Sequence, residues 1–365
     1  MSPSADTTLQ SRSIPIADEE IRQDGCFSSL PVRKSTSGER CDEALQLLLK
    51  DWAVCMRDGR EKTTSGIENP ISGNWIALVV PDCLPERLGL LTYITNIVFL
   101  HDDAAEATSA EEAHESLNSE FIAGLAEKLS RRNSLIEDAV DSSAPAVQLP
   151  SGRPVMGRSR NFSTIVSPMQ RLLEPWVKKL LACDRDLGLE VLEAWRKYYN
   201  EVDTKEAEDL DGLAEYIPYR IMDFGSGPWL VMVRFGMGLH LTEQELESVE
   251  RIVEAALKSA ALTNDYWSWP KEKAGLDATK SRLMNGVSFA IKDHGFREAQ
   301  ARDHIKSLAI DAEQEYLRLT EKYVIANTDA KTDVHKYLLA VGFFAAGKSL
   351  WSSTCPRYNK HRNLS

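Results

Sequence analysis

The sequence predicts an all-α fold, formed by a single domain of the 365-residue chain. Nearly every periodic segment has apolar residues at three- and four-residue spacing, which is typical of amphipathic helices. No series of alternating strand segments and no strand, glycine-rich loop and helix signature is found, which argues against a sheet-based nucleotide-binding fold. We therefore expect a bundle of helices.

The elements can be assigned in chain order. Residues 1–25 are polar and are predicted to be disordered, leaving 26–365 as the domain. Residues 142–163, rich in Ser, Pro, Gly and Arg, are predicted to form a long mobile surface loop. This loop does not divide the domain, because acidic motifs on both sides of it are expected to converge. Helices are predicted over Ala44–Met56, Leu84–His101, Met169–Leu181, Leu187–Tyr199, Leu213–Met222, Glu243–Trp267, His304–Tyr323 and Val334–Ser353.

Composition excludes several classes of protein. No apolar run is long enough to cross a bilayer, and the polar N-terminus is not a secretory signal peptide. The six cysteines are scattered without a CxxC pair, which predicts a reduced, cytoplasmic protein without structural zinc. A formal charge of -12 argues against binding to nucleic acid or anionic lipid. An anionic substrate would be repelled unless bound cations and local basic groups reversed the field.

The first acidic motif, FLHDDAAE, contains Asp102, Asp103 and Glu106. Helical steps back from Asp102 reach Val98, Thr95, Leu91 and Leu88. The carboxylate therefore continues an apolar, inward-facing stripe, where it needs a compensating cation. The alternative is an ordinary solvated acidic helix end, and this short motif alone does not decide between the two.

The second motif, NDYWSWPKE, places Asn264, Ser268 and Glu272 at positions i, i+4 and i+8 on one side of a helix. Amide, hydroxyl and carboxylate oxygens are suitable ligands for Mg2+. Small residues on the preceding turns leave room for a cavity. Pro270 is expected to bend or end the helix near Tyr266, so that Glu272 lies past a kink. The alternative is an ordinary polar helix end, but the two motifs together favour a magnesium-dependent enzyme acting on a diphosphate.

These residues resemble the class I terpene cyclases, and specifically the N-terminal cyclase domain of fungal bifunctional terpene synthases of the fusicoccadiene and ophiobolin synthase type. The resemblance extends in order over almost the whole chain from about residue 26. It is carried by the two motifs and by FSSLPVRK (27–34), DW (51–52), GNWIALVVPDCLPERL (73–88), YIPYRIMDFG (216–225), FGMGLHLT (235–242) and SLWSSTCPRY (349–358).

The resemblance implies a class I terpenoid synthase fold, a single helical bundle around a central active-site cavity, with three Mg2+ ions. Asp102 would bridge two ions with support from Asp103 and Glu106, and a third ion would bind the oxygen ligands Asn264, Ser268 and Glu272. The acidic motif here is DDxxE where the family also has DDxxD, a departure that does not threaten metal binding.

The resemblance also assigns the diphosphate contacts. Arg220 would sense the diphosphate and Asp223 would link it to a helix break. Hydrogen bonds to the diphosphate would come from Arg220, Lys271, Arg357 and Tyr358. Phe224 stands between Asp223 and Gly225, so the backbone carbonyl that assists ionisation cannot be assigned to one residue. The alternative for Arg220 is a structural ion pair with Asp223.

Aromatic side chains would stabilise the carbocation in the cavity, because ring faces attract cations. The candidates are Trp75, Phe99 and Trp351, with Trp229, Phe224 and Tyr266 as weaker ones. For any single ring the alternative is ordinary core packing.

We therefore expect a cyclase that ionises a linear prenyl diphosphate, C20 geranylgeranyl or C25 geranylfarnesyl, and forms a polycyclic di- or sesterterpene. The alternatives are a chain-elongating prenyltransferase of the same fold, which would need a second aspartate-rich motif, and a non-catalytic helical binding protein. The chain is either an excised domain or stands alone. Expected partners are the substrate, a C-terminal prenyltransferase domain in a full-length protein, and a second copy in a homodimer.

Overall fold

The computed structural model describes residues 12–56, 68–106, 168–201, 209–274, 283–328 and 332–359, without the side chains of residues 56, 101–106, 168–170 and 199–201. The elements are the strands β1 (Ser13–Pro15) and β2 (Arg33–Ser35) and the helices α1 (Asp18–Gln23), α2 (Glu39–Met56), α3 (Trp75–Val79), α4 (Pro85–Glu106), α6 (Pro168–Cys183), α7 (Arg185–Glu201), α8 (Leu213–Asp223), α9 (Ser226–Met237), α10 (Glu243–Ala274), α11 (Gly286–His294), α12 (Glu298–Ala326) and α13 (Thr332–Thr354).

All eight predicted helices are present, and the all-α fold class is confirmed. The expectation that Pro270 could end its helix is wrong, because α10 continues through this proline to Ala274. Pro270 removes one amide donor, and α10 as a whole is supported by packing against α12 and α13. The helices α3, α9 and α11 were not predicted, since α3 and α9 are mostly apolar without a clear polar face and α11 spans only nine residues.

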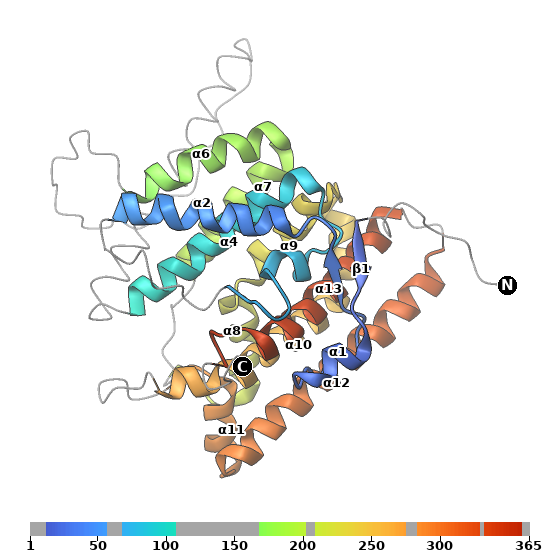
Figure 1. Cartoon of the computed structure of the whole chain (residues 1–365). Coiled ribbons are helices and arrows are strands. Elements are labelled where there is room, and N and C mark those ends of the chain that lie inside the picture. The colour runs from blue at the N-terminus through green and yellow to red at the C-terminus, as the bar shows by residue number, and fades with distance from the viewer. Residues whose placement is uncertain are drawn as a thin grey trace, which may run out of the picture.

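Helix α10 and helix α13 pack against each other near the middle of the molecule. Figure 1 shows α2, α4 and α6 on one side of this pair, with α11 and α12 on the other. Helix α3 packs against both α13 and α4, and α9 packs against α7 and α13. The end of α13 therefore lies close to α8 and to the second half of α10 (Figure 1).

The N-terminal segment forms an antiparallel pair of strands, with Ser13 opposite Ser35. The buried Ser13 hydroxyl donates a 2.6 Å hydrogen bond to Asp82, and Ile21 of α1 is buried in the main core. The prediction of disorder is therefore wrong for residues 12–25. The polar composition of this segment gave no indication of the few long-range contacts that hold it. The rest of the proposed domain division stays a prediction, and the predicted loop at 142–163 lies outside the described residues.

The parts of the chain that the structure describes contain no helix long and apolar enough to span a membrane. All six cysteines lie within these parts, and each is a free thiol.

Close backbone contact fixes α3 against α13. A Cβ atom on Gly347 of α13 would lie 2.3 Å from the carbonyl oxygen of Leu78 and 3.0 Å from the nitrogen of Val79. Backbone atoms cannot move aside as a flexible side chain can. Because Trp75 begins α3, this contact also sets the position of its indole ring.

We predict that Gly347→Ala destabilises the protein by about 2 kcal/mol or more, because the added methyl group separates two packed backbones. Gly227→Ala is a matched control in α9, since a Cβ atom there meets no atom within 4 Å. The control is expected to be neutral or stabilising by up to about 1 kcal/mol. Urea unfolding monitored by circular dichroism measures both values, and equal stabilities would contradict the packing assigned to Gly347.

Candidate active site

Arg220 connects α8 to α10. Its guanidinium donates hydrogen bonds to Asp223 Oδ2 at 2.7 Å, Asp265 Oδ1 at 2.9 Å and Asn264 Oδ1 at 2.8 Å. Burial disfavours the charged form, but attraction to Asp265, Tyr216 and Asp223 outweighs it and raises the pKa of Arg220. The structural pair with Asp223 is thus present, and the same guanidinium also contacts a candidate metal ligand.

Asp265 is a residue of the site that the sequence reasoning did not select. Its side chain is 0% exposed and accepts hydrogen bonds from the Tyr216 hydroxyl at 2.6 Å and the Gly286 amide at 2.9 Å, besides the bond from Arg220. A buried carboxylate that accepts three donors is held in one orientation. Its position directly after Asn264 could have drawn attention to it. It was not selected because a helical residue next to Asn264 points to a different face of the helix.

The three predicted oxygen ligands of α10 lie on one continuous helix, although a kink before Glu272 was expected as one outcome. Asn285, at the start of α11, donates hydrogen bonds to Glu272 Oε2 at 2.9 Å and to Ser268 Oγ at 3.4 Å. Ser268 and Asn264 are 1% and 8% exposed. Asn285 therefore orients two candidate ligands, a role that sequence spacing did not reveal. Burial raises the pKa of Glu272 above its ordinary value, and the attraction of the nearby Arg220 opposes this rise only in part.

The donor set of α10 fits a hard divalent cation. It consists of an amide oxygen, a hydroxyl and a carboxylate, all of them oxygen ligands of the kind Mg2+ prefers. In the described part of the chain, no three His, Cys, Asp or Glu side chains are placed so that they could hold a metal ion. A metal bound here would take the carboxylate of Glu272 together with the neutral oxygens of Asn264 and Ser268.

The predicted helix break is present at the end of α8. Helix α8 ends at Asp223 and α9 begins at Ser226, while Gly225 between them has a φ of 82°, in the left-handed region that favours glycine. The Asp223 carbonyl accepts a hydrogen bond from the Tyr198 hydroxyl, and the Phe224 carbonyl accepts one from the Trp229 indole, both at 3.0 Å. Neither carbonyl is thus distinguished as the one that assists ionisation.

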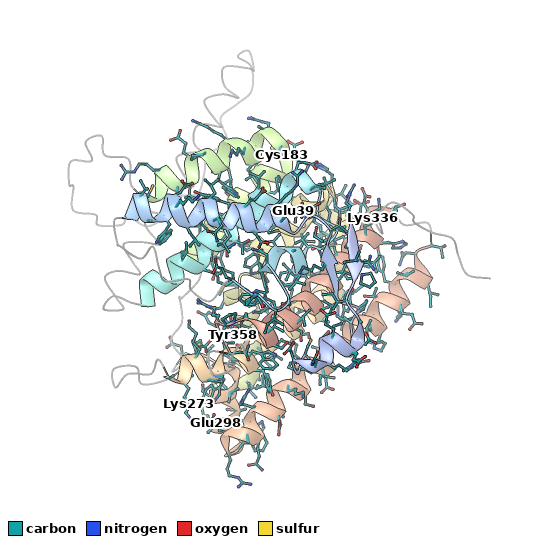
Figure 2. The ribbon with its side chains drawn as sticks, in the orientation of Figure 1. Glu39, Cys183, Lys273, Glu298, Lys336 and Tyr358 are labelled. Atoms are coloured by element: carbon teal, nitrogen blue, oxygen red, sulfur yellow. The ribbon has the colours of Figure 1, made fainter. Side chains whose placement is uncertain are left out.

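The C-terminal Arg357 and Tyr358 follow the end of α13 and reach the same region. Asn264 Nδ2 donates a 2.9 Å hydrogen bond to the Tyr358 hydroxyl. Figure 2 shows Tyr358 in the lower part of the molecule, where α8, α10 and the end of α13 meet. The Arg357 guanidinium lies over the ring of Phe99, with Cζ 5.6 Å from the ring centroid. Lys271 lies half-buried on α10 beside Glu272.

Helix α4 carries the first acidic motif. It extends to Glu106, so Asp102, Asp103 and Glu106 belong to its last turns, but their side chains lie outside the described ones. Phe99, one turn earlier, provides the connection to α10. It contacts Arg357, whose neighbour Tyr358 bonds to Asn264. The two motif-bearing helices are therefore joined through the C-terminal segment.

The three predicted cavity rings come together. The ring centroids of Trp75 and Trp351 are 5.2 Å apart, those of Phe99 and Trp351 5.9 Å, and those of Trp75 and Phe99 6.3 Å. Trp229 contacts Trp75 at 6.0 Å and belongs to the same cluster. Tyr266 instead packs against Phe27 and Trp267, so it lies in a separate aromatic group.

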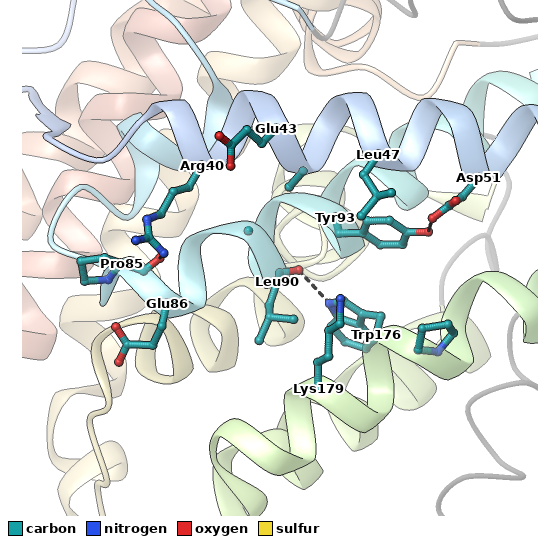
Figure 3. A pocket seen from close by; sticks show the side chains of 13 residues that line it. Arg40, Glu43, Leu47, Asp51, Pro85, Glu86, Leu90, Tyr93, Trp176 and Lys179 are labelled. Atoms are coloured by element: carbon teal, nitrogen blue, oxygen red, sulfur yellow. Dashed lines mark hydrogen bonds between the residues drawn. The ribbon is translucent and has the colours of Figure 1, made fainter.

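Two open pockets lie away from these residues. One of about 390 Å3 is formed by α2, α4 and α6, and its lining includes Tyr93, Trp176 and Lys179 (Figure 3). Another of about 540 Å3 lies between α9, α10 and α13. Neither pocket is lined by a residue of the two motifs.

We predict that Asp265→Asn destabilises the fold by about 3 kcal/mol, because it removes the fully buried one of the two carboxylates that pair with Arg220. The double variant with Arg220→Met should lose at least about 1 kcal/mol less than the sum of the single losses. Chemical denaturation of all four proteins measures this coupling. Asp311→Asn on the exposed surface of α12 is the control and should change stability by less than about 0.5 kcal/mol. Strictly additive losses would contradict the network.

The chain matches the family model for "Terpene synthase family 2, C-terminal metal binding" over residues 93–315. Among characterised relatives, it is 27% identical over 359 residues to the sesterterpene synthase btcA of Colletotrichum orbiculare, covering 98% of this chain and 47% of that protein. It is 30% identical over 356 residues to the bifunctional terpene synthase FUP1 of Fusarium proliferatum, covering 97% of this chain and 43% of that protein. The chain thus spans less than half the length of these relatives.

Solved structures share the fold. Aristolochene synthase from Penicillium roqueforti superposes with a TM-score of 0.64 at 19% identity, covering 87% of this chain and 95% of that one. Germacradien-4-ol synthase from Streptomyces citricolor gives a TM-score of 0.65 at 14% identity, covering 90% and 99%. These likenesses show that the helical bundle is the fold of class I terpene synthases.

Proposed function

Because the chain belongs to terpene synthase family 2, we propose that it is a magnesium-dependent class I terpene cyclase that ionises a linear C20 or C25 prenyl diphosphate and cyclises the carbocation to a polycyclic hydrocarbon. The observation that supports this most is the contact of Arg220 with Asn264, and of Asn264 with Tyr358. Arg220, the proposed hydrogen-bond donor to the diphosphate, and Asn264, a candidate metal ligand, thus lie together with Tyr358 of the C-terminal segment. The relatives named sesterterpene synthases favour a substrate of this size.

The proposed metal ligands are Asp102, Asp103 and Glu106 from α4 and Asn264, Ser268 and Glu272 from α10. Three bound Mg2+ ions would neutralise the diphosphate and act as Lewis acids that weaken the allylic C–O bond. The residues of this chain supply the remaining stabilisation. Arg220, Lys271, Arg357 and Tyr358 donate hydrogen bonds toward the charge that develops on the leaving group.

Ionisation also produces a carbocation, which would lie against the cluster of aromatic rings. Trp75, Phe99 and Trp351 would present ring faces to the carbocation, each contributing about 0.5–2 kcal/mol of attraction. Their packing against one another excludes water, which would otherwise quench the cation as an alcohol. In this proposal a hydrocarbon product follows from a dry aromatic surface next to the diphosphate site.

The proposal also includes a further domain in a longer protein and a cellular location. The limited coverage of the relatives and the word "bifunctional" in the name of one of them support a C-terminal prenyltransferase domain in a longer protein. The free cysteines support a cytoplasmic location. A chain-elongating prenyltransferase is disfavoured, since α10 offers Asn, Ser and Glu where a second aspartate-rich motif would be needed.

We predict that Asp102→Ala and Asn264→Ala each lower diphosphate release at least about 1,000-fold, because each removes a ligand of the metal cluster. Geranylgeranyl and geranylfarnesyl diphosphate with Mg2+ are the substrates, and a coupled phosphate assay with mass spectrometry of the organic extract gives the readout. Chelation of Mg2+ should abolish wild-type turnover. Asp311→Ala and Asn327→Ala, at surface positions, should retain it. Unaltered turnover in both site variants would refute the assignment.

Tyr358→Phe tests the C-terminal segment separately. Loss of its hydroxyl removes the hydrogen bond to Asn264 and a donor to the diphosphate, so kcat is expected to fall by about 10-fold to 100-fold. Steady-state kinetics with the better substrate measure this. Tyr323→Phe, whose hydroxyl contacts Ser248 on the exposed surface, is the matched control. A kcat equal to that of the control would exclude Tyr358 from the site.

A further inference from the structure

Lys348 of α13 is a buried cation that the proposed function does not use. It is 2% exposed, and its Nζ lies 5.0 Å from the ring centroid of Trp75, 5.3 Å from Tyr358, 5.4 Å from Trp351 and 5.8 Å from Phe224. Within the described parts of the chain, no carboxylate lies within ion-pair distance of it. An ammonium without an anionic partner is costly to bury, and four ring faces are the compensation that this environment offers.

These rings are shared with the site proposed for the carbocation. Trp75 and Trp351 are two of its three candidate rings, and the hydroxyl of Tyr358 holds Asn264. A single tyrosine side chain therefore separates Lys348 from the candidate metal ligands. We name the group of Trp75, Phe224, Trp351 and Tyr358 the aromatic cage. A substrate carbocation entering this cage would share it with the lysine.

We propose that Lys348 determines the product of the cyclisation: its ammonium repels positive charge from the α13 wall of the aromatic cage and thereby selects the carbon that carries the charge when the proton is lost. This inference rests on the proposed function. Two like charges within one dry cage repel each other far more strongly than in water. In its protonated form Lys348 has no lone pair, so the ammonium cannot be alkylated by the carbocation.

The charge of Lys348 can be changed near neutral pH. Burial lowers the pKa of Lys348 to about 7. The charged groups that act on it are Arg220 on α8 and Arg357 after α13, which lower the pKa further, and Asp265 on α10, which raises it. Cys355 is a neutral thiol near pH 7, because burial raises its pKa to about 11. The facing residue of α3 is the uncharged Trp75. The lysine is thus mainly charged at about pH 6 and mainly neutral at about pH 8.5.

The experiment compares the product profiles of the wild type, Lys348→Met and Lys336→Met at about pH 6, 7 and 8.5, with Mg2+ and whichever of the C20 and C25 diphosphates the wild type converts. Methionine has a similar length and no charge. Lys336 lies near the opposite end of α13 (Figure 2), so its variant is the control. Gas chromatography with mass spectrometry gives the fraction of each product, normalised to the diphosphate released.

In Lys348→Met the fraction of the main wild-type product is expected to fall by at least about fivefold, and its profile should not change with pH. As the pH rises and the repulsion disappears, the fraction of the main low-pH product should fall in both the wild type and Lys336→Met.

Equal profiles in Lys348→Met and the wild type would overturn the inference, and so would parallel pH shifts in both. If Lys348→Met does not fold or turn over, the wild-type pH series decides, and a constant product ratio overturns the inference. A wild type that releases no diphosphate would instead refute the proposed function, and the inference with it.

Discussion

The buried ion pair between Arg220 and Asp265 is the interaction on which the arrangement of the site depends. Asp265 is fully enclosed and also accepts hydrogen bonds from Tyr216 and from the amide at the start of α11, so it fixes α8, α10 and α11 together. Arg220, held in this way, points its other nitrogens at Asp223 and Asn264. Since a buried pair by itself contributes little net stability, a functional reason for placing it here is the precise direction it gives to the guanidinium.

The distribution of charge follows from the same constraint. The chain as a whole is acidic, with a formal charge of -12, yet Arg220, Lys348 and Arg357 gather in its interior near the end of α13. The carboxylates Asp223, Asp265 and Glu272 lie among these cations, so bound metal ions would also be needed to reverse the field that a diphosphate meets. The rings around Lys348 and Arg357 help to accommodate these two cations, because ring faces interact favourably with positive charge. The same environment suits the carbocation that we propose as the reaction intermediate.

Sequence reasoning predicted the long helices well, because their apolar residues repeat over several turns. It missed α3 and α9, which are mostly apolar, and the nine-residue α11, and it missed β1 and α1, which are held by contacts distant in sequence. For the site, spacing along α10 grouped Asn264, Ser268 and Glu272, and the resemblance added Arg220 and Tyr358. Asp265, Asn285 and Lys348 were missed because their roles arise from neighbours on other helices. No periodicity within one segment contains that information.

The central claim is that α4 and α10 direct oxygen ligands at one magnesium cluster that binds the diphosphate. A crystal structure of the protein with Mg2+ and inorganic diphosphate tests it most directly. The account predicts ions coordinated by Asp102 from α4 and by Asn264, Ser268 and Glu272 from α10, with the anion bridging them and accepting hydrogen bonds from Arg220. Ions bound to only one of these helices, or an anion bound away from Arg220, would contradict it.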